Sequence, residues 1–183
     1  MILGVLRDGM LNVTDFVMCL LDERKVFMVT IRIGKPEDAA RLEELYTELE
    51  LDAVMYQPQH FVMSPKGTRT QQMEEFWDSD HQRMFVAEDD GEVIGFAHAV
   101  LIKSKDVPCL KPELAVYLQD LVVTASYRSK GIGTQLMDVV KEYGRENNAD
   151  FFRTQVFPLN MDGLRFYYRN GFEDTMITIE CPL

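Results

Sequence analysis

The sequence has few cysteines, no long apolar run and no recognisable secretion signal. Its three cysteines, Cys19, Cys109 and Cys181, are widely separated and form no metal-type pair. An odd number of cysteines argues against a disulfide framework, so we expect a reducing compartment, the cytoplasm. No apolar run approaches the roughly 18 residues of a membrane span. The amino terminus lacks a basic start and a small-residue cleavage site, so we expect no export and no membrane partner.

Basic residues are also scarce relative to acidic ones. Lys and Arg together number 19 against 30 Asp and Glu, which gives a formal net charge of -11. This balance argues against nucleic acid as the main partner, because phosphate binding needs a basic surface. It is compatible with a cationic substrate such as an amine or a basic peptide. The three histidines, His60, His81 and His98, lack the spacing of metal ligands, so we expect no metal.

The length and pattern of the chain predict one compact domain with an amino-terminal extension. Of the 183 residues, 46% are hydrophobic, which is sufficient for a real core. A natural domain start at Met28 divides the chain into an extension, residues 1–27, and a domain, residues 28–183. The extension is interpreted either as the result of an upstream start codon or as an arm that packs on the domain or on a second subunit.

Within the domain, apolar patterns of period 2 alternate with patterns of period 3.6. The order β-α-α-β-β-β-α-β-α-β predicts a mixed sheet with helices on its faces, an α/β (α+β) architecture. The strands are expected in segments 29–33, 83–102 (a hairpin), 114–124, 151–157 and 173–180, and the helices in segments 37–49, 71–82, 133–148 and 161–170.

The stretch "SYRSKGIGT" lies between an expected strand and an expected helix. Such a turn exposes backbone N–H groups, which form an anion site together with the positive end of the helix dipole. Gly131 and Gly133 allow an anion to approach the backbone closely, and Arg128 and Lys130 can add charge. A diphosphate is the expected ligand, and a plain strand-to-helix turn is the alternative. The phosphate P-loop pattern is absent, and Leu136 replaces the third glycine of a dinucleotide-binding fingerprint.

Two segments resemble the motifs of the GNAT family of N-acetyltransferases. Segment 121–137, "LVVTASYRSKGIGTQLM", is similar to the family's acetyl-CoA-binding motif, with Arg128, Gly131 and Gly133 at the positions of the pattern [RQ]-x-x-G-x-[GA]. Segment 160–172, "NMDGLRFYYRNGF", is similar to its second motif, with Gly163 where alanine is usual. The resemblance covers about 155 residues from residue 29 onward. It implies a central mixed, mostly antiparallel sheet of six to seven strands with helices on both faces.

The resemblance also implies where acetyl-CoA, the acyl donor, would bind. Main-chain groups of the motif strand would pair with the pantetheine arm, and one of their amides could stabilise the oxyanion. Amides of the turn would hold the diphosphate, and the second motif would add one contact to the coenzyme. The implied coenzyme-binding residues are Leu121, Val122, Val123, Arg128, Ser129, Lys130, Gly131, Ile132, Gly133, Thr134, Asn160 and Tyr167.

Two side chains are the candidate catalytic groups. The resemblance implies that Tyr167 protonates the departing thiolate, and a core aromatic is the alternative interpretation. Asp120 is the first candidate for the base or amine-binding group, because strand alternation points it opposite Leu121 and Val123. It could instead be an ordinary polar strand residue. His98 and Glu113 are weaker candidates for the base.

Three functions remain open from the sequence. The first is direct transfer of an acetyl group to a primary amine of a small molecule, with no covalent enzyme intermediate. The segment "YLQDLVV" resembles the L-E-D stretch of polyamine acetyltransferases, but Gln119 replaces the glutamate. The second is acetylation of a protein lysine or amino terminus, and the third is a non-catalytic acyl-CoA-binding module. Trp77, Phe76, Tyr56 and Phe61 are candidates to line the acceptor pocket, and dimers are common among similar proteins, so a homodimer is compatible with the resemblance.

Overall fold

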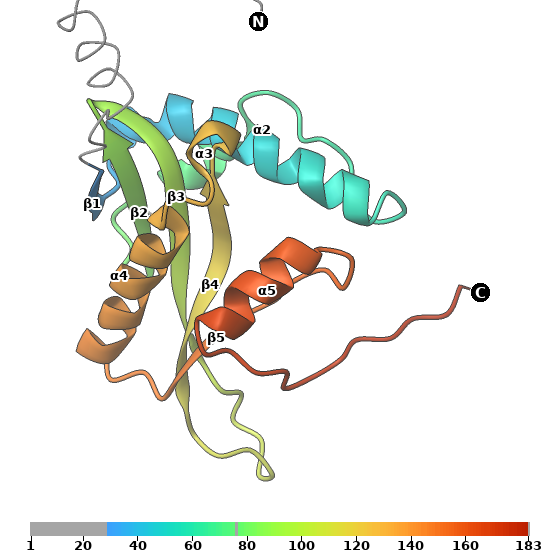
Figure 1. The fold of residues 1–183 in the computed structure, drawn as a ribbon. Helices are drawn as coiled ribbons and strands as arrows, with labels where there is room; N and C mark the ends of the chain where they lie inside the picture. Colours follow the sequence, from blue (N-terminus) through green and yellow to red (C-terminus); the bar gives the residue numbers. More distant parts are fainter. Residues whose placement is uncertain (1–28, 76, 183) are drawn as a thin grey trace, which may run out of the picture.

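The computed structural model describes residues 29–75 and 77–182, which form one sheet covered by helices on both faces (Figure 1). The strand order is β1-β2-β3-β4-β5, antiparallel throughout except for the parallel pair β4–β5. The predicted extension, residues 1–27, lies outside the described residues. The strands are β1 (Thr30–Ile33), β2 (Gln82–Asp89), β3 (Glu92–Lys103), β4 (Leu114–Val123) and β5 (Phe151–Thr154). The α-helices are α2 (Ala39–Tyr56), α3 (Thr68–Glu74), α4 (Ile132–Glu146) and α5 (Met161–Arg169).

Strand alternation divides the core into two layers. On one face of the sheet, Phe85 and Ala87 of β2 pack with Leu136 and Val140 of α4. On the other face, Met84 and Val86 of β2 pack with residues of α2 and α3 that include Leu42, Leu45, Tyr46 and Met73. The predicted mixed sheet with helices on both faces is therefore confirmed.

A β-bulge interrupts the pairing of the central strands β3 and β4. His98 pairs with Asp120 but Ala99 pairs with Leu118, so Gln119 is an extra residue in β4. An extra residue bends its strand and increases the local twist. Pairing between β4 and β5 ends at the same place, with Leu118 opposite Thr154. Beyond this point β4 continues alone on that side for Gln119–Val123, and the two parallel strands separate.

The number of strands and the bounds of two helices differ most from the prediction. Five strands are formed in the described part of the chain instead of the six to seven expected, and no strand forms at 173–180 because the segment pairs with no edge of the sheet. Strand β5 is shorter than the predicted 151–157. Helix α2 continues to Tyr56, because the chain remains rich in helix-forming residues until Gln57, which precedes Pro58. Helix α3 begins at Thr68 and ends at Glu74, whereas the sequence predicted 71–82.

None of the helices in the described ranges combines the length and apolar character that a bilayer span requires.

Candidate active site

The predicted anion-binding turn forms the start of α4. Gly131 precedes the helix with a φ of 81°, and Ser129 has a φ of 62°, so the backbone turns sharply through the left-handed region. The first backbone hydrogen bond of the helix runs from the Gln135 N–H to the Gly131 carbonyl. The amides of Ile132, Gly133 and Thr134 therefore lie at the exposed positive end of the helix, and none of them donates to a backbone carbonyl within the described residues. This geometry fits an anionic group such as a diphosphate.

The two glycines of this turn serve different purposes. At Gly131 no atom lies within 4 Å of a hypothetical β-carbon, so glycine is required there by the positive φ and not by crowding. At Gly133 a β-carbon would lie 3.3 Å from the ring of Phe166 in α5. Gly133 thus lets α5 pack against the amino-terminal end of α4, and the two sequence motifs meet at this contact.

Both basic side chains of the turn, Arg128 and Lys130, contact other groups of the protein in this structure. The Arg128 Nε donates to the Val123 carbonyl at 2.9 Å, and its guanidinium lies 3.9 Å from Glu48 and 4.0 Å from Asp52 of α2. The ammonium group of Lys130 lies 4.7 Å from the centre of the Tyr127 ring. Arg128 therefore faces both the end of β4 and two carboxylates that would compete with a diphosphate for its charge.

The predicted pantetheine-binding residues lie on the free part of β4. Leu121, Val122 and Val123 pair with Ala97, Phe96 and Gly95 of β3 on one side only. On the other side β5 has already separated, so no strand of the described residues pairs with this segment, and the Val123 carbonyl accepts from the Arg128 Nε instead. An extended ligand could pair with the main-chain groups on this side.

Gly95 sets how closely β3 and β4 approach each other here. A β-carbon at Gly95 would lie 2.7 Å from the Val122 carbonyl oxygen and 3.2 Å from the Val123 Cα. Real β-carbons do not come this close to backbone, so the position of the free β4 segment depends on glycine at this site. Sequence reasoning did not identify Gly95, because a glycine within an apolar strand gives no signal about the strand opposite.

Asp120 lies on the α2 face of the sheet, opposite Leu121 and Val123, which pack on the α4 side. The Tyr46 hydroxyl of α2 donates to the Asp120 Oδ2 at 3.1 Å. The His98 Nδ1 lies 3.5 Å from the same oxygen, and the His98 Nε2 lies 3.0 Å from the Gln82 Oε1. Asp120 is thus part of a polar cluster of four side chains, which we call the Asp120 cluster, within an otherwise apolar layer.

The side chains of the Asp120 cluster differ in how much of their surface is exposed. Tyr46 and His98 are buried, with 3% and 7% of their surfaces exposed, whereas the Asp120 side chain is 20% exposed. Burial raises the pKa of Tyr46 well above its usual value, and the negative charge of Asp120 acts in the same direction. Tyr46 is therefore a neutral hydrogen-bond donor that orients the carboxylate. Asp120 is more exposed than Tyr46 and His98, so a ligand can reach its carboxylate.

Tyr167 of α5 lies near the point where β4 and β5 separate. Burial raises the pKa of Tyr167 above its usual value; the neighbouring Thr154 hydroxyl partly offsets this, and the negative charge of Asp120 raises the pKa further. Its ring packs against Phe166 and Phe172, each at 5.4 Å between centroids. Tyr167 is therefore held as a neutral phenol, with a proton to donate, within electrostatic reach of Asp120.

Asn160 caps α5, and its environment explains the glycine in the second motif. The Asn160 Oδ1 accepts a hydrogen bond from the Gly163 N–H at 2.8 Å. A β-carbon at Gly163 would lie 2.7 Å from the Asn160 Nδ2. Glycine at position 163 thus makes room for the cap, and any contact between Asn160 and a coenzyme would use the Nδ2 group.

The remaining sequence candidates are Glu113 and the four aromatic residues expected to line the acceptor pocket. Glu113 lies at the opposite end of β4 from the Asp120 cluster and pairs with Arg153 at 2.6 Å. Tyr56 and Phe61 both contact the ring of Phe157, at 6.0 and 5.3 Å between centroids. They form an aromatic group next to the segment that follows the end of β5. Trp77 packs against the α2 layer of the core, and Phe76 lies outside the described residues.

Two carboxylates of α2 accept hydrogen bonds from the loop between α2 and α3 and from the start of α3. Glu50 accepts hydrogen bonds from the Ser64 N–H and hydroxyl, each at 2.8 Å, and from Arg69 at 2.7 Å. Glu43 accepts from the Gly67 and Thr70 amides and from the Thr70 hydroxyl. The Arg69 guanidinium also lies 4.8 Å from the centre of the Tyr46 ring, which connects this loop to the Asp120 cluster.

No group of three or more metal-ligating side chains is present among the described residues.

Comparisons with known proteins identify the family of this chain. The model of the "Acetyltransferase (GNAT) family" matches residues 42–172, so the chain belongs to that family. It is thus an acetyl-CoA-dependent N-acetyltransferase. The aminoglycoside N(6')-acetyltransferase type 1 of Salmonella typhimurium is 30% identical over 102 residues, which cover 56% of this chain and 70% of that protein. An uncharacterised N-acetyltransferase of Bacillus subtilis, YhfO, is 25% identical and covers 80% of this chain and 91% of its own length.

Solved structures support the fold. A mutant of the BH1408 protein from Bacillus halodurans has a TM-score of 0.80 and 21% identity, and covers 84% of this chain and 99% of that chain. The aminoglycoside N-acetyltransferase AAC(6')-Iy, in complex with CoA, has a TM-score of 0.68 and 23% identity, and covers 87% of this chain and 97% of that chain.

Proposed function

We propose that this enzyme transfers the acetyl group of acetyl-CoA directly to a primary amine of a small molecule, and that aminoglycosides are the acceptor class to test first. The observation that carries the proposal is the joint placement of Asp120 and Tyr167 at the point where β4 and β5 separate. The similarity to an aminoglycoside acetyltransferase supports the choice of acceptor. The net charge of -11 is compatible with a polycationic acceptor.

The acyl donor would bind along the free segment of β4 and end at the start of α4. Main-chain groups of Leu121 and Val123 would pair with the pantetheine arm, as an added strand would. The amides at the start of α4 would accept the diphosphate. Arg128 would then exchange its two carboxylate neighbours, at 3.9 and 4.0 Å, for phosphate oxygens at hydrogen-bond distance.

The chemical step needs one proton acceptor and one proton donor. Asp120 would take the proton that the amine loses as its nitrogen attacks the thioester carbonyl. Tyr167 would give a proton to the thiolate sulfur as the carbon–sulfur bond breaks, which leaves the amide and free CoA as products. The raised pKa of Tyr167 keeps this donor protonated at neutral pH.

A panel assay tests the proposal. The protein is incubated with acetyl-CoA and, separately, with aminoglycosides, polyamines, amino acids and lysine-containing peptides, and free thiol is measured. Release that depends on a small amine supports the proposal. Release with peptides alone identifies a protein acetyltransferase, and tight binding of acetyl-CoA without release on any acceptor identifies a binding module. Either of these results would overturn the proposal.

A further inference from the structure

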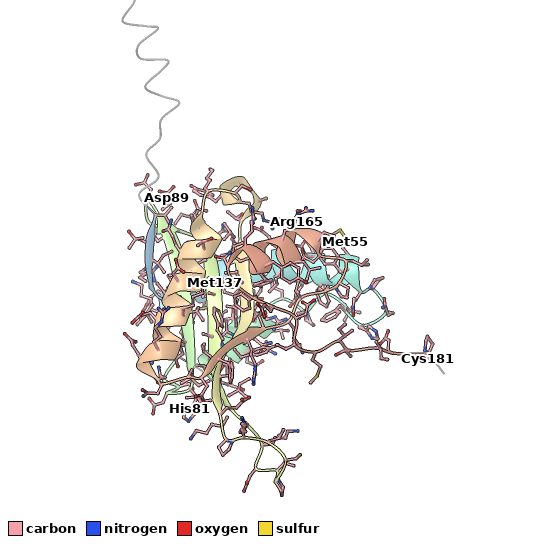
Figure 2. The ribbon with its side chains drawn as sticks, turned by 60° about the horizontal axis from the view of Figure 1, so that its bottom comes forward. Met55, His81, Asp89, Met137, Arg165 and Cys181 are labelled. Carbon is pink, nitrogen blue, oxygen red and sulfur yellow. The ribbon has the colours of Figure 1, made fainter. Side chains whose placement is uncertain are left out.

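The Arg69 side chain of α3 contacts the ring of Tyr46, the residue that orients Asp120. The centre of its guanidinium lies 4.8 Å from the centre of the Tyr46 ring. Tyr46 is buried, and its hydroxyl donates to the Asp120 Oδ2 at 3.1 Å. Helices α2 and α3 pack on the face of the sheet opposite α4, which carries the labelled Met137 in Figure 2 (Figures 1 and 2). One side chain therefore links α3 to the candidate base.

The place of the Tyr46 hydroxyl depends on how the Tyr46 ring is held. The phenolic oxygen lies at the far end of the ring, so a tilt of the ring moves the hydroxyl away from Asp120. Two groups contact the ring: the buried Phe96 ring of β3, at 4.6 Å between centroids, and the Arg69 guanidinium. Phe96 belongs to a close-packed core that resists displacement, and a guanidinium over an aromatic ring attracts it electrostatically. Arg69 thus helps to hold the ring in the orientation that reaches Asp120.

Arg69 is itself anchored by a carboxylate of α2. Glu50 lies four residues after Tyr46, so both side chains project from the same face of the helix. The Arg69 Nε and Nη2 each lie 2.7 Å from the Glu50 Oε1. Burial alone would raise the pKa of Glu50, but hydrogen bonds from Ser64 and Arg69 outweigh this and lower it. The carboxylate is therefore charged at neutral pH, and its short contacts fix the guanidinium.

We propose that Arg69 is a positioning residue for acetyl transfer: it fixes the Tyr46 ring and thereby the direction from which the Tyr46 hydroxyl holds the Asp120 carboxylate. The inference rests on the proposed function, in which Asp120 takes the proton that the amine loses. Arg69 acts through Tyr46 and need not touch either substrate. If Arg69 only fastened α3 to α2, its loss would lower stability and would not act through the Tyr46 hydroxyl.

Three variants of the full-length protein separate these roles. Arg69→Met removes the charge and keeps much of the side-chain length, and Arg69→Lys keeps the charge. Arg41→Met is the matched control, because the Arg41 side chain on α2 is 29% exposed and that of Arg69 is 33% exposed. The partners of Arg41 lie outside the Asp120 cluster; they are Glu44, Glu92 and the Val93 carbonyl.

The first readout is kcat/KM for the amine that the panel assay identifies. We expect Arg69→Met to lower it by about 2- to 30-fold, the fold-change that corresponds to the usual strength of a cation–π contact. The Kd for acetyl-CoA should be unchanged, Arg69→Lys should recover most of the loss, and Arg41→Met should match the wild type. Glu50 loses a partner in Arg69→Met, which lowers Tm, so the rates are measured well below the Tm of every variant.

The deciding readout combines Arg69→Met with Tyr46→Phe. Tyr46→Phe removes the hydroxyl and keeps the ring, so in that background Arg69→Met should cause no further loss of kcat/KM. Losses that multiply across the two substitutions would refute a role through Tyr46. An Arg69→Met protein with wild-type kcat/KM, or with a weakened Kd for acetyl-CoA that accounts for its loss, would refute it equally.

These outcomes differ from a failure of the proposed function. If the wild type acetylates peptides and no small amine, the proposed acceptor class is wrong, and the same comparison made with a peptide decides the role of Arg69. If the wild type acetylates nothing, the proposed function fails and the positioning role fails with it. Losses that multiply in an active protein contradict only the role of Arg69.

Discussion

Replacing Gly95 by alanine tests whether the free segment of β4 holds the acyl donor. The added β-carbon would lie 2.7 Å from the Val122 carbonyl oxygen, closer than real β-carbons come to backbone, so β3 and β4 must move apart. Overpacking of this kind costs about 1–3 kcal/mol. Alanine recovers about 0.5–1 kcal/mol, because it loses less backbone entropy than glycine on folding. The expected net loss is about 0–2.5 kcal/mol, which lowers Tm by up to about 10 °C for a chain of this size.

The same displacement should weaken binding of acetyl-CoA. If one main-chain hydrogen bond to the pantetheine arm is lost, the cost is about 0.5–1.5 kcal/mol, or about a 2- to 13-fold rise in the KM for acetyl-CoA. Gly144→Ala is the control, because its β-carbon would lie 2.7 Å from the Val116 Cγ1, in the half of β4 that pairs with β5. That variant should alter Tm without raising the KM for acetyl-CoA. A Gly95→Ala protein with a lowered Tm and an unchanged KM would refute the placement of the donor on β4.

Three further predictions concern single side chains. Tyr167→Phe should lower kcat by about 10²- to 10⁴-fold, the usual contribution of a general acid, and leave the Kd for acetyl-CoA unchanged; equal turnover by both proteins would remove the acid role. Asp120→Asn should lower kcat or raise the KM for the amine with little change in Kd for acetyl-CoA, and a weakened Kd would instead indicate a structural role. Burial disfavours the charged form of Asp38, but hydrogen bonds from Arg32 and the Lys35 amide outweigh this and lower its pKa. Its stabilising contribution is therefore complete above the unfolded pKa of about 3.9 and is lost as pH falls below it, so Asp38→Asn should flatten the acid side of a plot of unfolding free energy against pH.

The fold and the donor half of the site could be predicted from sequence because their signals are local. The turn at Gly131 combines a strand, a positive-φ glycine and a helix start within a dozen residues. Asn160 and Gly163 likewise lie within one helical turn, and their contact explains why glycine replaces the alanine that is usual in the family. The geometry of such a motif is determined by residues within the motif itself.

The Asp120 cluster was harder to predict because its contacts are distant in sequence. Tyr46 and Asp120 are 74 residues apart, and within the apolar stripe of α2 the pattern gives Tyr46 no role beyond the core. Their contact depends on the register of β4 against β3, which includes a bulge at Gln119. The hydrophobic periodicity of one strand cannot reveal a bulge, because a bulge depends on how the strand pairs with its neighbour.

The C-terminal segment, residues 173–182, shows a different limit. Its β-branched alternation is typical of a strand, but a strand forms only where the edge of a sheet receives it. The sequence predicted a strand within the chain's own sheet, whereas the structure leaves the segment extended and exposed. Local propensity determines the conformation of such a segment and leaves its partner undetermined.

The central claim is that Tyr167 and Asp120 act on an amine while acetyl-CoA lies on β4 and the start of α4. The most direct measurement is a single-turnover reaction with acetyl-CoA and an aminoglycoside, in which the acetylated amine is followed by mass spectrometry and free CoA by its thiol. We predict that both products appear together in equal amounts, and that Tyr167→Phe slows both without weakening coenzyme binding. Thiol release without an acetylated amine, or no reaction with any amine although acetyl-CoA binds, would contradict the account.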